Sequence, residues 1–269
     1  MLNKIINYFL QLNFCFKFFM SFCTNIYIFF LKKLLIIEKI GSIFNHFLYG
    51  GNYMYKYDKN FFEIIDTEEK AYWLGFIAAD GNIRKDLHKM RIELNIQDKK
   101  HLEKFRSVIH GNMPIKEWIR HKNHSCYIEV NSVKLCKDLL QYGVTPNKSL
   151  TLEILFNKIP FELQHHLMRG YFDGDGSLNM YEKEGYEYWE ISFIGTQHFL
   201  NYIMKFFNKK HKISTCGNNF RFNFKKGEDI KDILNILFKD AHISLDRKKE
   251  KYDKFIALND YQGVCLSRT

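Results

Sequence analysis

The segment Leu167-Met168-Arg169-Gly170-Tyr171-Phe172-Asp173-Gly174-Asp175-Gly176 decides the fold that this sequence predicts. It follows Pro160, which is typical of a helix start, and it is apolar up to the polar ending Asp175-Gly176. Gly170 and Gly174 are four residues apart, so they share one helix face and allow another backbone to approach closely. The segment therefore predicts a buried helix that packs tightly against a partner helix.

A second copy of the pattern lies upstream, as Tyr72-Trp73-Leu74-Gly75-Phe76-Ile77-Ala78-Ala79-Asp80-Gly81. Its Gly75 and Ala79 repeat the small residues, and its Asp80-Gly81 repeats the polar ending at the same spacing. Two such helices, packed through their small faces, would bring Asp80 and Asp175 side by side. Carboxylates that close repel each other unless a cation lies between them, so the pair predicts a divalent-metal site.

These two copies, WLGFIAADG (73–81) and MRGYFDGDG (168–176), resemble the motifs of the LAGLIDADG homing endonucleases, in the form with two motifs on one chain. The resemblance covers roughly residues 66–255. It implies an α+β fold of two pseudo-symmetric halves, each with the order αββαββα. The halves would pack through the paired motif helices, and their antiparallel sheets would form a DNA-binding saddle.

The resemblance also implies which residues hold the catalytic metal, Mg²⁺ or Mn²⁺. The penultimate acidic residue of each motif falls on Asp80 and Asp175, with the backbone carbonyls of Ala79 and Gly174 as further ligands. The first motif has Ala where the second has Asp173, so Asp173 receives no catalytic role.

The motif endings have two other interpretations. Gly-rich helix ends are commonly C-caps with no further role. Asp173-Gly174-Asp175 could also open a calcium loop, with Glu184 at position 12, but position 6 is Leu178 where such a loop needs Gly.

Composition restricts the class of protein. The chain has 269 residues and a net charge of +10, which favours a polyanionic partner such as nucleic acid. The six cysteines form no C-x-x-C pair, so we expect free thiols. A zinc site was considered and fits no known spacing; its ligands would be His121, His124, Cys126 and Cys136. Abundant Phe and Tyr with only 3 Pro indicate AT-rich codons, which favours a mitochondrial or chloroplast origin, with some phage or bacterial genomes as the alternative.

Four regions are expected along the chain. Residues 1–52 form a hydrophobic leader or extension; Lys17 interrupts its apolar run, and membrane anchoring by residues 1–50 is the alternative. Residues 53–157 form the first half and 158–255 the second, with a last helix over about 228–240. Residues 256–269 form a C-terminal tail.

Strictly alternating segments predict strands with one apolar and one polar face. Residues 89–97 place Met90, Ile92, Leu94 and Ile96 on one side, and residues 220–225 place Phe220, Phe222 and Phe224 on one side. The opposite faces carry side chains suited to base edges and phosphates. The candidates for DNA contacts are Lys89, Arg91, Asn95, Lys116, Arg120, Arg221, Asn223 and Lys225.

Resemblance further implies one lysine of each half near the reacting phosphates. Lys148, Lys158 and Lys248 are the candidates, and Lys148 and Lys248 hold similar places after their motifs. Residues at strand ends could also act around the site. They are Gln97, Thr196 and Gln197.

The sequence thus predicts a monomeric, metal-dependent endonuclease that cuts double-stranded DNA at a long target site. Resemblance implies staggered cuts with 3′ overhangs and mobility of the encoding intron. Two alternatives remain: an RNA maturase that binds intron RNA without needing both carboxylates, and a DNA-binding regulator without catalysis.

Overall fold

The computed structural model describes residues 55–121 and 123–266. The chain divides into the units Met1–Met54 and Tyr55–Thr269, and all described residues belong to the second. The expected leader, with its alternative as a membrane anchor, lies outside them. Within the described ranges, no helix has the length and apolar character needed to cross a bilayer.

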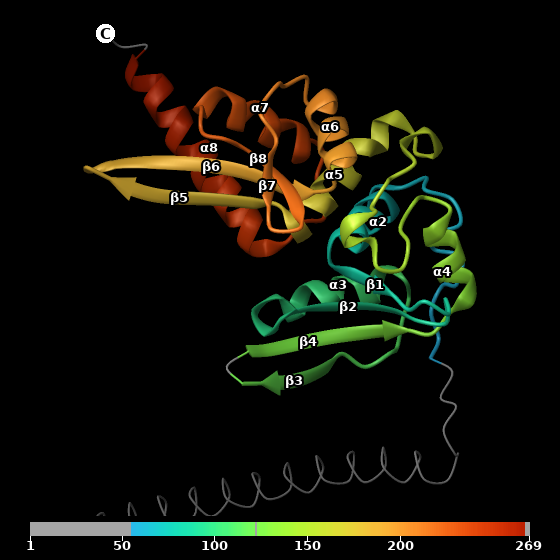
Figure 1. Cartoon of the computed structure of the whole chain (residues 1–269). Coiled ribbons are helices and arrows are strands. Elements are labelled where there is room, and N and C mark those ends of the chain that lie inside the picture. The colour runs from blue at the N-terminus through green and yellow to red at the C-terminus, as the bar shows by residue number, and fades with distance from the viewer. Residues whose placement is uncertain (1–54, 122, 267–269) are drawn as a thin grey trace, which may run out of the picture. The chain divides into compact units, whose positions relative to one another are not determined.

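The first half has the expected order of elements (Figure 1). They are helix α2 (Glu68–Asp80), strands β1 (Gly81–Ile83) and β2 (Met90–Asn95), helix α3 (Lys99–Val108), strands β3 (Lys116–Arg120) and β4 (Asn123–Val130), and helix α4 (Val133–Leu140). Local capping explains where two helices begin. Thr67 accepts a hydrogen bond from the Lys70 N–H at the start of α2, and Ser132 accepts one from the Leu135 N–H at the start of α4.

The second half repeats this order. Its elements are helix α5 (Phe161–Asp175), strands β5 (Ser177–Lys183) and β6 (Tyr186–Gly195), helix α6 (Gln197–Phe206), strands β7 (Ser214–Cys216) and β8 (Asn219–Phe224), and helix α7 (Gly227–Leu237). The predicted α+β class and the αββαββα order of both halves are confirmed.

One further helix, α8 (Asp246–Leu266), was not expected from the sequence. It begins inside the second half and crosses residue 255, so the last helix of that half is α8 and not α7. Its first turns are mostly charged and show no apolar period that would predict a helix. Tertiary packing explains its place, because Phe255 contacts Trp189 and Tyr252 stacks on Phe238 at 4.3 Å between ring centroids.

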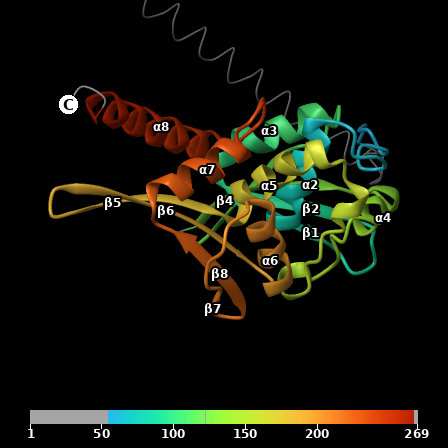
Figure 2. The same cartoon turned by 90° about the horizontal axis from the view of Figure 1, so that it is seen from above.

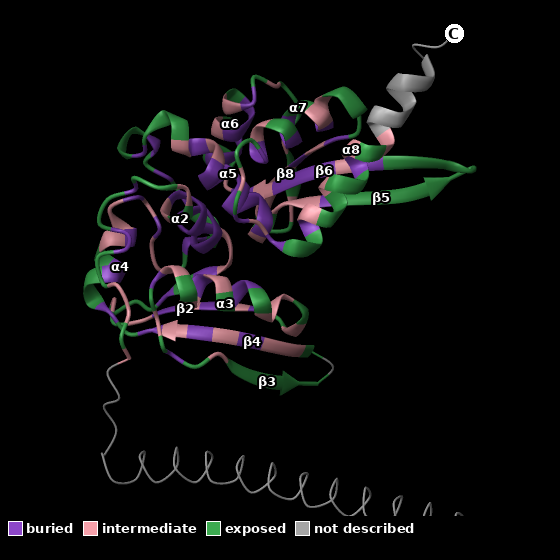
Figure 3. Cartoon of the chain, turned by 180° about the vertical axis from the view of Figure 1, so that it is seen from behind, coloured by how far each residue is buried: buried purple, intermediate pink, exposed green. Residues whose placement is uncertain are grey.

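Each half contains a four-stranded antiparallel sheet, ordered β1-β2-β4-β3 in the first and β5-β6-β8-β7 in the second. Met90, Ile92 and Leu94 of β2 are buried, as are Phe222 and Phe224 of β8, so the predicted apolar faces are confirmed. Phe220 and Ile96 are only partly buried against the core. Figure 3 shows the buried residues between sheets and helices, while the outer strands β3 and β5 are largely exposed.

Helices α2 and α5 lie side by side and join the two halves (Figure 2). Their contact depends on glycine. A Cβ at Gly75 would lie 2.0 Å from the Leu167 carbonyl oxygen, and a Cβ at Gly170 would lie 1.9 Å from the Tyr72 carbonyl oxygen. Both obstacles are backbone atoms of the partner helix, so no side-chain movement could make room.

Buried polar groups fix the pair at both ends. Arg169 is fully buried in α5 and pairs with Glu68 at the start of α2. Near the other end, the buried Asp173 carboxylate accepts hydrogen bonds from the Tyr72 hydroxyl and the Leu245 N–H, both at 2.7 Å. Asp173 therefore has a structural role, in agreement with the absence of a predicted catalytic one, and it does not open a calcium loop.

Substituting either interface glycine should destabilise the whole fold. We expect Gly75→Ala and Gly170→Ala to lower the unfolding free energy by several kcal/mol, because the added methyl forces the two backbones apart. Thermal melts of the purified proteins would measure this. Gly111→Ala is the matched control, since its Cβ would meet the flexible Met113 side chain at 2.5 Å. Equal melting temperatures for all three variants would contradict the role of close backbone approach.

Candidate active site and nucleic-acid interface

Asp80 and Asp175 are the last residues of α2 and α5. The two helix ends are in contact, since a Cβ on Gly174 would lie 2.3 Å from the Ala79 Cβ and 3.3 Å from an Asp80 carboxylate oxygen. Each carboxylate therefore stands at the negative end of its helix dipole, close to a second negative end. This arrangement opposes ionisation and favours a bound cation.

The electrostatics of both carboxylates agree with that geometry. Burial, reinforced by the nearby Asp175 charge, raises the pKa of Asp80 to about 6. Burial also raises the pKa of Asp175, although Lys148, Lys248 and a hydrogen bond with Tyr171 act in the opposite direction. The Tyr171 hydroxyl lies 2.8 Å from the Ile194 carbonyl oxygen as well, so its single proton is shared between two acceptors that hold it beside Asp175.

Two of the three predicted lysines meet at this site. Lys148 is 8% exposed and donates hydrogen bonds to the carbonyl oxygens of Ala79 and Gly81, at 2.8 and 2.5 Å. Lys248 is 2% exposed and donates to the carbonyl oxygens of Phe172, Asp173 and Gly176. Lys148 thus satisfies the Ala79 carbonyl and Lys248 the Asp173 carbonyl, which lie in the last turns of α2 and α5 where intrahelical donors run out. The Phe172 carbonyl also accepts from the Gly176 N–H.

The charge of these lysines is coupled to the carboxylates. Burial lowers the pKa of Lys248 to about 8, while the charges of Asp173, Asp80 and Asp175 oppose that change. Burial likewise lowers the pKa of Lys148, against the opposite influence of Asp175 and Asp80. The lysines therefore cap the helices and carry positive charge to the carboxylate pair.

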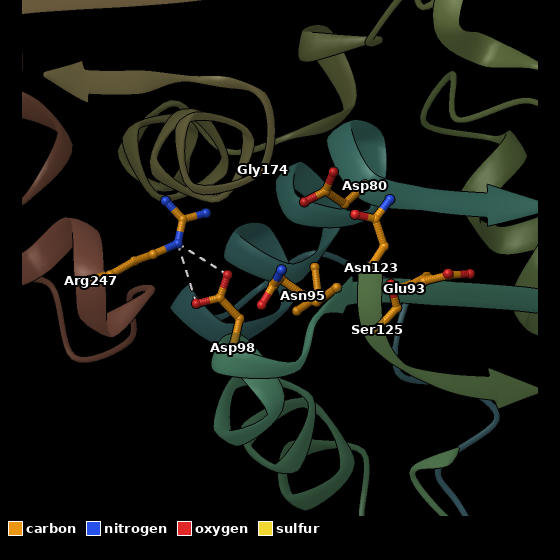
Figure 4. A pocket seen from close by; sticks show the side chains of 9 residues that line it. Asp80, Glu93, Asn95, Asp98, Asn123, Ser125, Gly174 and Arg247 are labelled. Carbon is orange, nitrogen blue, oxygen red and sulfur yellow. Dashed lines mark hydrogen bonds and ion pairs between the residues drawn. The ribbon is translucent and has the colours of Figure 1, made fainter. Parts of the chain in front are cut away.

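A cavity of about 500 Å³ opens beside Asp80 (Figure 4). Polar side chains of the first sheet line it together with groups of the second half. Arg247, in the first turn of α8, reaches in and pairs with Asp98, with its Nε 3.0 Å from a carboxylate oxygen. The other lining residues are Glu93, Leu94, Asn95, Asn123, Ser125 and Gly174.

A smaller cavity of about 110 Å³ lies beside Asp175. Lys148, Tyr171 and Thr196 contribute to its wall, and Asn219 lines it from the start of β8. The side-chain oxygen of Asn219 is buried without a hydrogen-bond partner in the described part of the chain. Each carboxylate therefore has its own cavity, but only the cavity of Asp80 is lined by an arginine.

Several predicted site residues lie elsewhere. Lys158 is exposed in a 3₁₀ turn (Phe156–Lys158) before α5, whereas Asp175 is the last residue of that helix, so Lys158 lies away from the carboxylate pair. Gln97 is exposed and lines a neighbouring cavity with Asp98 and Arg247, not the one beside Asp80. Thr196 does line the cavity of Asp175, where it also caps α6 and donates to the Leu152 carbonyl oxygen. Gln197 is exposed and lines neither cavity.

Sequence analysis missed three residues of the site. Arg247 precedes Lys248 in a run of charges, with nothing local to distinguish it. Asp98 directly precedes α3, a position typical of a helix cap, yet its side chain makes no capping hydrogen bond and binds Arg247 instead. Asn219 follows Gly217 and Asn218, a composition that is typical of a turn and does not indicate a site residue. Only contacts between residues far apart in the sequence show that these three residues belong to the site.

The predicted DNA-contacting residues do share one face of each sheet. Residues paired across antiparallel strands point to the same side, and the pairs Arg91–Glu129, Asn95–Ser125 and Lys116–Tyr127 place their side chains opposite the buried Ile92 and Cys126. The remaining candidates follow the same alternation, as Lys89, Arg120, Arg221, Asn223 and Lys225. The two cavities open onto these polar faces, through Asn95 and Ser125 in one case and Asn219 in the other.

The donor set fits a hard divalent cation that shares its ligands with a substrate. Mg²⁺ commonly uses one or two carboxylates and completes its octahedron with waters and phosphate oxygens. Asp80 and Asp175 supply such carboxylates at raised pKa, and the described residues contain no cluster of three or more His, Cys, Asp or Glu. The Ala79 carbonyl already accepts from Lys148, so it is a weaker candidate ligand than the carboxylates.

Fold and site together define a protein of two homologous halves with a carboxylate pair at their junction and a polar sheet face on either side. Two family models agree with this description: a LAGLIDADG-like domain matches residues 67–142, and the WhiA LAGLIDADG-like domain matches residues 164–251. The chain therefore belongs to the LAGLIDADG family, in the form with both motifs on one chain. No curated protein matches the sequence.

Solved structures show the same fold at low sequence identity. The homing endonuclease I-GzeII, in complex with a DNA target, is 17% identical with a TM-score of 0.50, over 76% of this chain and 92% of that chain. The meganuclease I-AabMI, bound to uncleaved DNA, is 15% identical with a TM-score of 0.50, over 72% and 91%. The meganuclease I-SmaMI, bound to uncleaveable DNA, is 12% identical with a TM-score of 0.51, over 71% and 91%.

The raised pKa of Asp80 predicts a specific dependence of stability on pH. Because the folded-state pKa of about 6 exceeds the ordinary 3.8, folding favours the protonated acid, and the metal-free protein loses stability as pH rises from about 4 to above 6. Asp80→Asn should therefore stabilise the metal-free protein by roughly 1–3 kcal/mol at pH 8 and hardly at all near pH 4. Thermal melts in a chelating buffer would test this. A variant less stable than wild type at pH 8 would contradict it.

Proposed function

We propose that this protein is a site-specific double-strand DNA endonuclease of the homing type, which uses Mg²⁺ or Mn²⁺ and promotes mobility of the intron that encodes it. The supporting observation is that Asp80 and Asp175 lie at adjoining helix ends, in cavities that open onto the polar faces of two sheets. A basic chain with long polar surfaces fits a long duplex target. We further propose that it acts as a monomer in a mitochondrion or chloroplast, because both motifs are on one chain and the codons are AT-rich.

Each residue of the site has a distinct role in this proposal. Asp80 and Asp175 hold the metal, which when bound supplies Lewis-acid activation of the scissile phosphate and a water of lowered pKa. Lys148 and Lys248 fix the last turns of the two motif helices and place positive charge near the phosphates. Arg247 adds a guanidinium to the Asp80 cavity, and the unpartnered Asn219 oxygen can accept a hydrogen bond in the Asp175 cavity.

Neutralising either carboxylate should separate binding from cleavage. Asp80→Asn and Asp175→Asn keep the side-chain shape but remove the charge that holds the cation, so we expect retained DNA binding and a loss of double-strand cleavage of at least about 100-fold. The target would first be selected from a randomised plasmid library or from DNA spanning the uninterrupted insertion site. Nicked and linear products would then be scored separately, with and without Mg²⁺.

Lys158→Ala is the matched control for this experiment, because Lys158 is exposed at the far end of α5. It should cut like wild type. Full linearisation by both aspartate variants would overturn the assignment of the metal to this carboxylate pair. Duplex binding by the wild-type chain without any cleavage would instead leave a DNA-binding regulator. Binding of structured intron RNA but of no duplex would instead leave an RNA maturase.

Substitutions on the polar face of β8 should distinguish residues that contact bases from residues that contact phosphates. Arg221 and Lys225 lie on the face opposite Phe222 and Phe224. If Arg221 contacts a guanine, Arg221→Ala should cost about 1–3 kcal/mol and relax the preference at one base pair. Lys225→Ala should weaken binding to all sequences alike and reduce the salt dependence. Unfolding of either variant would show that this face has been assigned wrongly.

A further inference from the structure

The polar faces of the two sheets carry acidic as well as basic side chains. Three carboxylates lie among the residues proposed to contact DNA, and each is paired with one of those cations. Arg91 pairs with Glu93 at 2.7 Å, Lys89 with Glu129 at 3.1 Å, and Lys225 with Glu190 at 3.2 Å. An acid on such a face opposes general attraction to phosphate, so its presence needs an explanation beyond the proposed binding.

Glu93 is the most firmly held of these acids. One of its oxygens faces Arg91 and the other accepts a hydrogen bond from the Trp118 indole N–H at 2.7 Å, across the sheet. The Arg91 guanidinium also lies over the Tyr127 ring at 3.7 Å, and its Nε is buried without a hydrogen-bond partner in the described part of the chain. The Arg91 guanidinium is thus held against the Tyr127 ring, and its Nε–H makes no hydrogen bond within the described residues.

The position of Glu93 adds to its significance. It lines the cavity that contains Asp80, so it stands where the polar face reaches the proposed cutting site (Figure 4). Glu129 is directly opposite Arg91 in the strand register, and its carboxylate pairs with Lys89 on the same face. Glu190 repeats the arrangement in the second half, where it holds Lys225.

We propose that Glu93, Glu129 and Glu190 are specificity-determining residues that restrain these cations until the correct bases are present. This inference rests on the proposed function as a DNA endonuclease. On an incorrect sequence, a phosphate must compete with the carboxylate for the cation. The carboxylate then also faces hydrogen-bond acceptors on the bases, which repel its negative charge. On a correct sequence, the carboxylate accepts a hydrogen bond from a cytosine or adenine amino group in the major groove, which releases the cation for a base or phosphate.

The consequence is that the acids weaken incorrect complexes more than correct ones. Removing one carboxylate should therefore raise affinity for DNA of mixed sequence and reduce discrimination. A cation released to a phosphate also adds about 0.9 to the slope of log affinity against log salt. A carboxylate that acts only through its charge would, when removed, raise affinity for all sequences alike and leave discrimination unchanged, so unchanged discrimination would overturn the proposal.

The test uses the full chain in chelating buffer, so that binding is measured without cleavage. Wild type, Glu93→Gln and Glu190→Gln would be titrated with a mixed-sequence duplex at several salt concentrations. We expect each variant to bind this duplex about 3- to 10-fold more tightly, with a steeper salt dependence. Selection from a randomised duplex library should show a weaker base preference at the position that each acid reads.

Glu117→Gln is the matched control. Glu117 pairs with Lys99 at 2.6 Å, but it lies on the opposite face of the same sheet, in register with the buried Cys126. It should bind the mixed duplex like wild type. If Glu93→Gln fails to fold, the same measurements on Glu190→Gln, in the other half, still test the proposal.

The outcomes separate this inference from the function on which it rests. Tighter mixed-sequence binding with reduced discrimination supports it. Variants that bind and select like wild type and Glu117→Gln overturn it, while the proposed nuclease stands. A wild-type chain that binds no duplex at all overturns both.

Discussion

The close approach of helices α2 and α5 is the constraint on which the rest of the structure depends. Gly75 and Gly170 each face a backbone carbonyl of the partner helix at a distance that leaves no room for a Cβ. This contact sets the separation of the two halves, and it also sets the separation of the two helix ends. The Glu68–Arg169 pair at one end and Asp173 at the other fix the orientation that the glycines permit. The same helix contact therefore determines both the packing of the core and the position of the site.

Bringing the helix ends together concentrates negative charge. Two carboxylates and two helix dipole ends converge there. Burial raises the pKa values of both Asp80 and Asp175, and the Asp175 charge adds to the rise at Asp80. Lys148 and Lys248 offset part of this charge through the carbonyls, at the cost of their own burial. The lysines thus satisfy backbone carbonyls, while the two carboxylates stay close together at raised pKa. Groups with perturbed pKa values in a cavity are typical of functional sites.

The two half-sites are similar in plan and different in detail. Arg247 and Asp98 form an ion pair in the cavity of Asp80, whereas the smaller cavity of Asp175 contains Tyr171 and the unpartnered Asn219. The two sheets also resemble each other in general and differ in detail. Both carry ion pairs on their polar faces, but the paired residues differ. A duplex target bound by such halves need not be palindromic, since each half presents its own pattern of donors and acceptors.

Sequence alone determined the class of fold, the order of elements and the carboxylate pair, because these follow from local patterns. Small residues four apart predict a close helix contact, and strict alternation predicts strands with one buried face. It did not predict α8, because charged turns acquire their helix through contacts such as Tyr252 on Phe238. Nor did it distinguish Lys148 and Lys248 from Lys158, or reveal Arg247, Asp98 and Asn219. Those assignments depend on which side chains meet across long separations, and only tertiary packing decides that.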